Sequence, residues 1–310
     1  MNKFSTAEFQ KFTADFTGGI FPEEAMCNHT SWKIGGPADY LVVPGTVDDI
    51  VAVLSFCKKN SVPLTIIGRG TNLLVSDDGI EGIVMQIADN FNKIIWLNST
   101  EVRAEAGSLL AALSRDAAKQ NCTGLEWACG IPGNVGGAVM MNAGAYGSNI
   151  SNYITEVEVV EISADGEPQM KVLTKGNLDF SYRHSGITEN QVVVGVNFLL
   201  EPGDRAESEK QMRELLQTRA AKQPLEYPSA GSVFKNPAGD HAGRLVEVSG
   251  CRGLSCGGAQ VSEKHGNFII NRGGATASDV LNLITKVQQI VLDKQGVELE
   301  TEVRKIGRFF

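Results

Sequence analysis

The sequence has few of the residues that build metal sites and no long block of positive charge. Its 310 residues include only four histidines and six cysteines, and no two cysteines form a C-x-x-C pair. Because structural zinc sites need closely spaced cysteine and histidine ligands, we expect no bound metal. The formal net charge is −8, without a run of lysine and arginine. We therefore expect no nucleic-acid partner, since phosphate backbones require clustered cations.

Long apolar stretches and targeting patterns are also missing. No apolar run approaches the roughly 20 residues that span a bilayer, and residues 1–9 lack the apolar core and cleavage pattern of a signal peptide. We therefore expect a cytoplasmic protein with no membrane partner. The cysteines are Cys27, Cys57, Cys122, Cys129, Cys251 and Cys256. In a chain of this kind they are expected to be reduced thiols in the core.

The sequence does contain enough apolar material for more than one core. Hydrophobic residues make up 42% of the chain, and 310 residues are typical of two or three domains. Alternating strand and helix patterns predict a mixed α+β fold. The break E-P-G-D at 201–204 predicts a domain boundary, after which a charged helix is expected over 205–222.

Apolar periodicity and turn residues place the other elements. Before the break we expect helices at 5–16, 46–60 and 108–120, strands at 38–43, 64–67, 83–87, 93–106 and 192–200, and a hairpin at 154–174 with a D-G turn. After it we expect helices at 240–248 and 278–294 and strands at 267–271 and 297–306. The segments 38–43, 46–60 and 64–67 predict a strand–helix–strand unit.

Two glycine-rich loops are the strongest functional signal. Residues 66–77, I-I-G-R-G-T-N-L-L-V-S-D, follow a predicted strand, and residues 124–147 contain seven glycines. Glycine lets the backbone approach a ligand closely, yet each one costs roughly 0.5–1 kcal/mol relative to alanine in regular structure. The first loop matches neither G-x-G-x-x-G nor a Walker loop, and alone it is explained equally well as a tight turn. Together the loops predict a bound dinucleotide with a large planar ring system.

Five motifs then occur in order along the chain. They are I-G-x-G-T-N-L-L-V (67–75), G-I-P-G-x-V-G-G-A-V-x-M-N-A-G-A-Y-G (130–147), Y-R-x-S (182–185), A-G-S-V-F-K-N-P (230–237) and L-E-x-E-V-R-x-I-G (299–307). From about residue 20 to the C-terminus, the chain resembles the UDP-N-acetylenolpyruvoylglucosamine reductase family, flavoenzymes of peptidoglycan precursor synthesis. The resemblance is to the shorter form of the family, which lacks an inserted loop over the substrate.

This resemblance implies a fold, a cofactor and a reaction. It implies an N-terminal helix and lead-in at 1–34, a vanillyl-alcohol-oxidase-type FAD-binding domain at 35–203, with subdomains at about 35–92 and 93–203, and an α/β substrate-binding domain at 204–310. NADPH would supply the hydride that reduces UDP-N-acetylglucosamine enolpyruvate to UDP-N-acetylmuramate. That role would link the protein to cell-wall biogenesis, cell shape, the cell cycle and cell division.

The two glycine-rich loops are the implied flavin site. The residues expected to bind FAD are Gly68, Arg69, Gly70, Thr71, Asn72, Leu73, Gly130, Ile131, Gly133, Gly136, Gly137 and Gly144. Some flavoproteins of this superfamily attach FAD covalently through histidine or cysteine. Residues 66–77 contain neither, which favours noncovalent flavin.

The implied reaction requires a fixed cation and a proton source. Hydride addition to the enol ether pushes negative charge onto its carboxylate, which needs stabilisation, and one proton must be delivered. Arg183 in F-S-Y-R-H-S suits the cation role, because its planar guanidinium can hold a carboxylate with two hydrogen bonds. The alternative is a surface arginine that follows a strand.

Ser232 in A-G-S-V-F-K-N-P is the implied proton donor to C2 of the enolpyruvyl group. It is not in G-x-S-x-G and has no evident Ser/His/Asp set, which argues against an acyl-enzyme nucleophile. The alternative is a serine in a glycine turn. Strand alternation predicts a solvated face for Glu302. Only its place in L-E-x-E-V-R-x-I-G makes Glu302 the implied partner of the developing enol or of Ser232.

Five further residues are candidates for binding the nucleotide sugar. They are Tyr182, Lys235, Asn236, Arg244 and His265. Tyr182 could pack on the sugar, and Arg244 could meet a phosphate near the start of a helix. An ordinary loop histidine is the alternative for His265. Two other functions also remain open, another FAD-linked oxidase of this fold acting on an alcohol or hydroxy acid, and a non-catalytic nucleotide-sugar binder.

Overall fold

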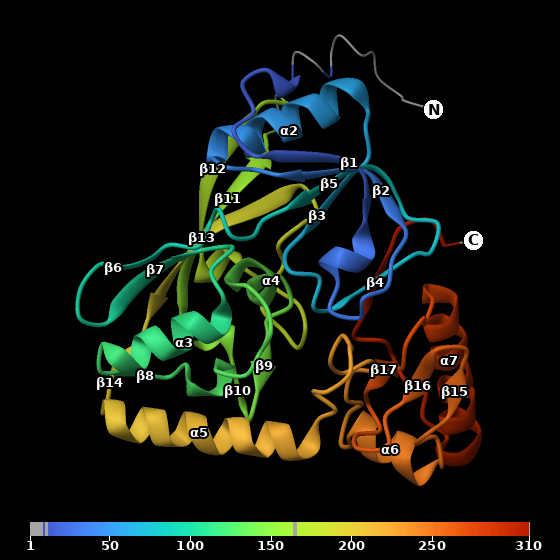
Figure 1. Cartoon of the computed structure of the whole chain (residues 1–310). Coiled ribbons are helices and arrows are strands. Elements are labelled where there is room, and N and C mark those ends of the chain that lie inside the picture. Colours follow the sequence, from blue (N-terminus) through green and yellow to red (C-terminus); the bar gives the residue numbers. More distant parts are fainter. Residues whose placement is uncertain (1–8, 10–11, 164–165, 310) are drawn as a thin grey trace. The chain divides into compact units, whose positions relative to one another are not determined.

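The computed structural model describes residues 9, 12–163 and 166–309 (Figure 1). The predicted helix at 5–16 and the predicted D-G turn at 165–166 lie partly outside these residues. Most of the other predicted elements are present, and the helix expected over 205–222 is α5, Arg205–Lys222.

The chain divides into two compact units. Unit 1 consists of Met1–Pro22, Tyr40–Arg69 and Gly82–Gln217, and unit 2 of Glu23–Asp39, Gly70–Glu81 and Thr218–Phe310. Both units are discontinuous, because two short N-terminal segments group with the C-terminal third. The predicted domains at 1–34, 35–203 and 204–310 assumed continuous stretches, and that division stays a prediction.

Two larger sheets organise the first two thirds of the chain. The four-stranded sheet has the order β1 (Gly19–Ala25), β2 (Pro37–Val43), β5 (Ile80–Gln86), β3 (Leu64–Ile67), and the unit division falls within β1, β2 and β5. The antiparallel five-stranded sheet has the order β12 (Pro168–Thr174), β11 (Ile154–Ile162), β13 (Gln191–Leu199), β7 (Glu101–Glu105), β6 (Ile94–Trp96). β11 and β12 are the hairpin predicted at 154–174.

Four helices accompany these sheets. They are α2 (Val47–Asn60), α3 (Leu110–Lys119), α4 (Val135–Met140) and α5. α2 begins where predicted, because Thr46 and Asp49 form a capping box, and it buries Ile50, Val53 and Leu54 on one stripe. It packs against β11 and β12, while α4 packs against β13 and β7 (Figure 1). The remaining short elements are η2 (Glu126–Ala128), η3 (Ile150–Asn152), η4 (Lys175–Asn177), β8 (Cys122–Thr123), β9 (Gly144–Ala145), β10 (Ser148–Asn149) and β14 (Glu201–Pro202).

The strand predicted over 93–106 is wrong as one element, because it is the hairpin β6–β7. A turn at 97–100 reverses the chain between the two strands. The Asn98 carboxamide oxygen accepts hydrogen bonds from the backbone N–H groups of Thr100, at 3.0 Å, and Glu101, at 2.8 Å. Such a bond from an asparagine side chain to its own turn favours chain reversal.

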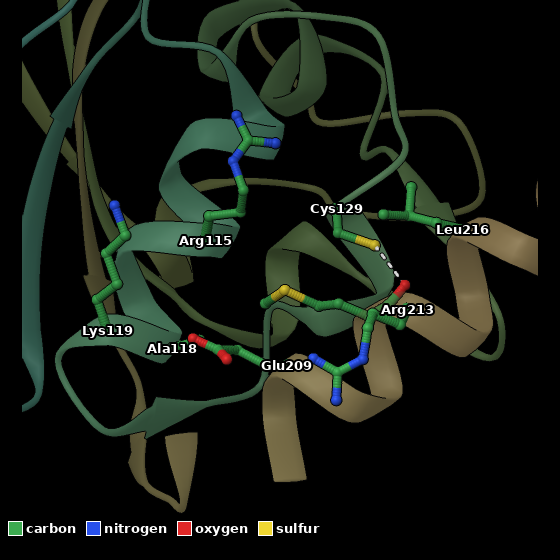
Figure 2. Close-up of a pocket in the computed structure, with 8 residues that line it drawn as sticks. Arg115, Ala118, Lys119, Cys129, Glu209, Arg213 and Leu216 are labelled. Atoms are coloured by element: carbon green, nitrogen blue, oxygen red, sulfur yellow. Dashed lines mark hydrogen bonds between the residues drawn. The ribbon is translucent and has the colours of Figure 1, made fainter. Parts of the chain in front are cut away.

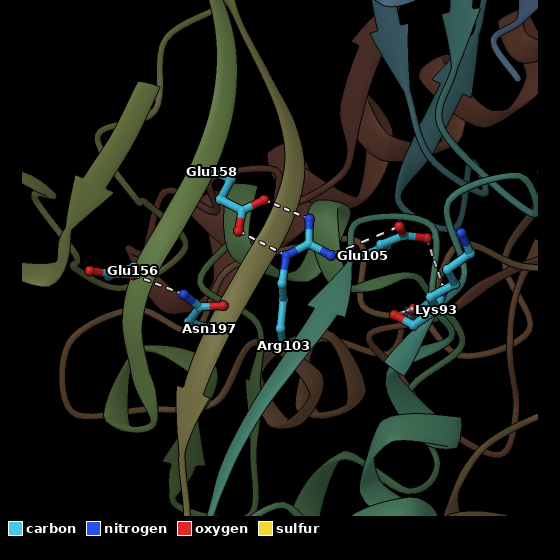
Figure 3. Close-up of polar contacts among 7 residues, drawn as sticks. Lys93, Arg103, Glu105, Glu156, Glu158 and Asn197 are labelled. Carbon is cyan, nitrogen blue, oxygen red and sulfur yellow. Dashed lines mark hydrogen bonds and ion pairs between the residues drawn. The ribbon is translucent and has the colours of Figure 1, made fainter. Parts of the chain in front are cut away.

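One face of the five-stranded sheet is held by charged side chains, shown in Figure 3. Arg103 donates two hydrogen bonds to the Glu158 carboxylate, at 2.8 and 2.6 Å, across the intervening strand β13. Gly195 lies between them, and a Cβ there would meet Glu158 at 2.5 Å. The hydrogen bonds that Arg103 donates to Glu158 are the main reason that the pKa of Arg103 is raised. The glycine of this strand therefore makes room for an ion pair.

Unit 2 has a core of its own around two helices. Its elements are η1 (Met26–His29), β4 (Leu73–Val75), α6 (Ala242–Val248), β15 (Ser255–Cys256), β16 (Ala259–Val261), β17 (Ile269–Asn271), α7 (Ala277–Gln295) and β18 (Arg304–Ile306). α7 packs against β15 and β16 (orange to red in Figure 1), and β18 pairs in parallel with β4. Fully buried Trp32 donates its indole N–H to the Ile269 carbonyl at 2.8 Å.

Two expectations about the C-terminal region and the cysteines need correction. Of the strand predicted at 297–306, only β18 is a regular strand, although Leu299 and Val303 are buried as the alternation predicts. Four of the six cysteines are buried, while Cys27 and Cys256 are only half-buried. No disulfide joins any of the six, all of which the structure describes.

Candidate active site

The glycine-rich loop at 124–147 is fixed within unit 1 by backbone and side-chain bonds. The Gly133 carbonyl accepts from Leu110 N at 3.0 Å, and Gly136 N donates to the Ala106 carbonyl at 2.8 Å. The buried Asn134 side chain caps α4, accepting from Gly137 N at 3.3 Å and donating to the Ile87 carbonyl at 2.8 Å. The predicted flavin loop is therefore a turn and a short helix held in place by these hydrogen bonds.

The predicted flavin glycines differ in why they must be glycine. A Cβ on Gly68 would meet the Asn134 side-chain oxygen at 2.4 Å, one on Gly136 would meet Ala106 Cβ at 3.0 Å, and one on Gly144 would meet the Ser148 carbonyl at 2.6 Å. These three glycines are explained by packing of the chain against itself.

Gly137 is different. A Cβ there would meet only the Asn134 side-chain oxygen, at 2.9 Å, with nothing else within 4 Å on that side. Apart from that oxygen, which would have to shift, a Cβ on Gly137 would meet no atom outside its chain neighbours and its own helix backbone, so this side has room for a ligand.

Arg69 in the first loop has an unsatisfied donor. Its guanidinium pairs with Asp89, yet its Nε is buried and lacks a hydrogen-bond partner among the described residues. A buried unpaired N–H costs free energy unless a ligand or water accepts from it. The open side of Gly137 and this unpaired donor both fit a bound polar, extended cofactor such as FAD.

The first loop continues into unit 2 after Arg69. Gly70 has φ +61°, and a Cβ there would meet the His29 carbonyl at 2.1 Å, so glycine is required by the fold itself. Thr71 lies between Gly70 and Asn72. Asn72 donates its side-chain N–H to the Glu302 carbonyl at 3.1 Å, and Leu73 begins β4. The segment predicted to bind flavin therefore also has a structural role next to Glu302.

The Y-R-H-S turn is fastened to the second glycine-rich loop. Ser181 and His184 exchange two backbone hydrogen bonds of 3.1 Å each, and the Asn142 side chain donates to the Ser181 carbonyl at 2.9 Å. Arg183 sits at φ +59°, a conformation that non-glycine residues rarely adopt. Its guanidinium lies over the Tyr182 ring, 4.9 Å from the centroid. The structure therefore places Tyr182 and Arg183 beside the predicted flavin loop.

Ser232 and Glu302 lie on adjacent extended segments of unit 2. Glu302 N donates to the Val233 carbonyl at 2.7 Å, and Phe234 forms an isolated antiparallel bridge with Thr301. Among the described residues, no hydrogen-bond partner is recorded for Ser232 Oγ, and the side chain is half-buried. Two residues more than 60 positions apart, each chosen from a separate motif, are thus brought together by the fold.

Asn267 is a residue of this site that the sequence did not single out. It is 4% exposed, and its carboxamide accepts from Phe234 N at 2.9 Å and donates to the Phe234 carbonyl at 2.8 Å. Its own carbonyl accepts from Val233 N at 2.9 Å. The Asn267 side chain thus satisfies the N–H and the C=O of Phe234, as a neighbouring strand would. It thereby fixes the backbone that carries Ser232. Nothing in its local sequence, H-G-N-F-I-I, marks this role.

Three of the predicted substrate residues are engaged with neighbours in unit 2. Lys235 pairs with Glu300 at 2.5 Å. The Asn236 side chain accepts from Ala242 N, at the start of α6, at 3.1 Å. Arg244 pairs with Asp240, and its hydrogen bonds are the main reason that the pKa of Asp240 is lowered to about 2. Contact of these residues with a substrate stays a prediction.

His265 lies against the same helix. Its Nδ1 accepts from Asn267 N at 3.2 Å, and its ring packs edge-on against Phe268 at 4.8 Å. Burial, and then the positive charge of Arg252, lower its pKa. The ring nitrogen therefore serves as an acceptor for the Asn267 backbone, and contact of His265 with a substrate stays a prediction.

The predicted catalytic residues are divided between the units. Ser232 and Glu302 share unit 2, whereas Arg183 belongs to unit 1, so their assembly into one site stays a prediction. No group of three histidine, cysteine, aspartate or glutamate side chains that could hold a metal occurs in the described part of the chain. Within the same residues, no helix is long and apolar enough to cross a membrane.

Comparison with known families matches two separate parts of the chain. Residues 38–169 match the family described as FAD binding domain, and residues 223–306 match the UDP-N-acetylenolpyruvoylglucosamine reductase C-terminal domain. These segments contain, respectively, the second glycine-rich loop and the Ser232 segment.

Relatives that match nearly the whole chain indicate the same family as these two matches. A UDP-N-acetylenolpyruvoylglucosamine reductase of Caldanaerobacter subterraneus subsp. tengcongensis is 46% identical over 291 residues, 94% of each chain. One of Clostridium botulinum is 45% identical over 310 residues, 99% of each chain. The crystal structure of the enzyme from Thermus caldophilus is 33% identical with a TM-score of 0.79, covering 94% of this chain and 99% of that one. The resemblance and the α+β fold class are confirmed, and the chain belongs to the UDP-N-acetylenolpyruvoylglucosamine reductase family.

Proposed function

We propose that this chain is an FAD-dependent oxidoreductase that uses NADPH to reduce UDP-N-acetylglucosamine enolpyruvate to UDP-N-acetylmuramate. The observation that carries the proposal is identity of 45% over 99% of the chain to relatives named for that reductase activity. The residues that we propose for this chemistry lie in the two glycine-rich loops and around Ser232.

Noncovalent FAD would be held by the two glycine-rich loops. Gly137 offers open backbone, and Arg69 offers a buried donor that pairs with no described residue. Thr71, Gly130, Ile131 and Gly133 belong to the same proposed site through their places in the loops. When bound, FAD supplies hydride transfer, from NADPH to C3 of the enolpyruvyl group.

Arg183 would hold the substrate carboxylate. Negative charge grows there as hydride reaches C3, and a guanidinium fixed beforehand stabilises that charge without reorganisation. The turn bonds of Ser181 and Asn142 hold Arg183 in its uncommon backbone conformation. Strained backbone of this kind persists where the surrounding structure determines it and is frequent at functional sites.

Ser232 would deliver the proton to C2, and Glu302 would assist it. The hydroxyl has no recorded partner among the described residues, which leaves it available to substrate. Its backbone is held by Asn267 on one side and by the Glu302 segment on the other. Glu302 would hydrogen-bond either Ser232 or the developing enol. Tyr182, Lys235, Asn236, Arg244 and His265 would bind the nucleotide sugar.

The wider role follows from this reaction. The protein would act in the cytoplasm in peptidoglycan precursor synthesis and so contribute to cell-wall biogenesis, cell shape, the cell cycle and division. This hydride and proton transfer needs no metal ion and no nucleic acid.

Ser232→Ala tests the assignment. The variant should retain flavin and be reduced by NADPH at the wild-type rate, because neither step needs the hydroxyl. Reduction of the enolpyruvyl sugar should slow by about 10²–10⁴-fold, the usual contribution of a positioned proton donor. Stopped-flow absorbance of each half-reaction measures this, with Ser229→Ala in the same segment as the control. Wild-type speed in the second half-reaction of Ser232→Ala would remove Ser232 from the donor role.

A further inference from the structure

A cavity lies between α3 and α5 in unit 1, beside Cys129 of the second glycine-rich loop. Its volume is about 250 Å³. Figure 2 shows Glu209 of α5 reaching toward Ala118 of α3, with Cys129 at one end, while Arg115 and Lys119 extend from α3 away from α5. The residues that line it are Arg115, Ala118, Lys119, Cys129, Glu209, Met212, Arg213 and Leu216.

The inner surface of this α3–α5 pocket is apolar. Ala118, Cys129 and Met212 are 1%, 5% and 6% exposed, and they form a small core cluster of their own. The Cys129 thiol donates to the Met212 carbonyl at 3.7 Å, which ties α5 to the loop. Leu216 extends the apolar surface outward and is 44% exposed. The pocket can therefore bury an apolar group.

The rim of the pocket is cationic. Arg115 and Lys119 stand one turn apart on α3, and Arg213 stands on α5. The one acidic lining residue, Glu209, is already paired with Arg205 at 2.6 Å. Within the described residues, no ion pair or hydrogen bond is recorded for the side chains of Arg115, Lys119 and Arg213. Two neighbouring positive charges on α3 and a third on α5, at the edge of an apolar floor, attract a ligand that is both anionic and apolar.

Arg115 and Lys119 also border a neighbouring hollow of about 330 Å³. Its lining is more polar and includes Asn92 and Asp116. One oxygen of Asp116 already accepts from the Trp96 indole at 2.8 Å. The two cations thus stand between an apolar space and a more polar one, an arrangement that suits a ligand with a tail and a charged head.

We propose that the α3–α5 pocket binds a free amphiphilic anion. A short alkyl chain or single ring would fill the apolar space, and a phosphate, sulfonate or carboxylate head would contact Arg115 and Lys119, with Arg213 adding positive potential from α5. The volume sets the size, because it lies just below the roughly 300–1,000 Å³ of ordinary small-molecule sites.

Isothermal titration calorimetry on the FAD-loaded full chain tests this with three probes. Octyl phosphate has both features, 1-octanol only the tail and inorganic phosphate only the charge. Octyl phosphate should bind at least about tenfold more tightly than either of the others, and more weakly at high salt, since exposed charges are screened. Equal affinity for octanol and octyl phosphate would overturn the role of the cations, and equal affinity for phosphate would overturn the role of the apolar floor.

Variants locate the binding on this pocket rather than at the nucleotide-sugar site. Arg115→Gln, Lys119→Gln and Arg213→Gln should each weaken octyl phosphate by about two- to fivefold, the range for exposed charge pairs. All three residues are exposed, so the fold should be kept. Lys210→Gln removes a charge from α5 outside the pocket and should leave the affinity unchanged.

Unchanged affinity in the triple variant would place the ligand elsewhere and overturn the proposal. Sedimentation with phosphatidylglycerol vesicles separates a free ligand from a membrane lipid. Wild-type protein that sediments with vesicles, and loses this in the triple variant, would overturn the assignment to a free ligand. Wild-type protein that stays in the supernatant supports it.

Discussion

Replacement of Asn267 by alanine should uncouple the Ser232 segment from the core of unit 2. The Asn267 side chain makes two hydrogen bonds to the backbone of Phe234, a residue that is 2% exposed. Removing it leaves a buried N–H and a buried C=O unsatisfied, and each costs about 1–3 kcal/mol. The free energy of unfolding should therefore fall by roughly 2–6 kcal/mol. In addition, Ser232 Oγ should lose its fixed position.

Asn267→Asp can keep only one of the two hydrogen bonds to Phe234. The carboxylate can still accept from Phe234 N, which lies 2.9 Å from the carboxamide oxygen. It has no N–H with which to replace the 2.8 Å bond to the Phe234 carbonyl. At neutral pH the buried carboxylate is also desolvated and has an oxygen against the Phe234 carbonyl oxygen. We therefore expect a loss in the free energy of unfolding at least as large as that of Asn267→Ala, measured by urea denaturation followed by circular dichroism.

Asn271→Ala is the matched control. This buried side chain donates to the Trp32 carbonyl at 3.0 Å and accepts from Gly273 N at 2.9 Å, but its side chain makes no recorded bond to the Ser232 segment. It should destabilise unit 2 while leaving reduction of the enolpyruvyl sugar near the wild-type rate. Asn267→Ala should slow that step in stopped-flow measurements. Equal slowing in both variants, or an Asn267→Ala protein as stable as wild type, would refute the positioning role.

Two further predictions concern unit 1. Gly137→Val should lower the amount of bound flavin, because the valine side chain would fill the space beside Gly137, which holds only the Asn134 side chain. The ratio of visible to 280 nm absorbance after dialysis measures the bound flavin, and a fully loaded variant would contradict this. Burial would raise the pKa of Glu126, but its hydrogen bonds, led by that from Ser208 at 2.6 Å, outweigh burial and hold the pKa below its ordinary value. The stabilisation this gives is present above the unfolded pKa of about 4.3 and is lost as pH falls through the lower folded pKa. Between pH 6 and pH 3, the melting temperature of the wild type should therefore fall more steeply than that of Glu126→Gln. Parallel curves of melting temperature against pH would contradict this reasoning.

Local signals in the sequence were sufficient for many elements of the fold. The predicted start of α2 at Thr46 and the bounds of α5 are confirmed, because a capping residue and the E-P-G-D break act within a few residues of the helix ends. Pairings between distant segments were out of reach. Residues 73–75 were read as part of a loop, but they form β4 with β18, more than 200 positions away.

The candidate site shows the same limit. Motifs identified Ser232 and Glu302 separately, and the fold brings their segments together. Asn267 was missed because its role depends on the backbone of Phe234, more than 30 residues away, which no local pattern reveals. The assembly of Arg183 with Ser232 and Glu302 stays a prediction.

The most direct test of the proposed reaction is a visible spectrum of the purified protein, first oxidised, then anaerobic with NADPH, then with the enolpyruvyl nucleotide sugar. The account predicts a flavin band that bleaches with NADPH and returns with the sugar while oxygen is excluded. A band that returns only with oxygen would contradict it and favour an oxidase of this fold. No band, even after FAD is added, would contradict the assignment of the glycine-rich loops to flavin.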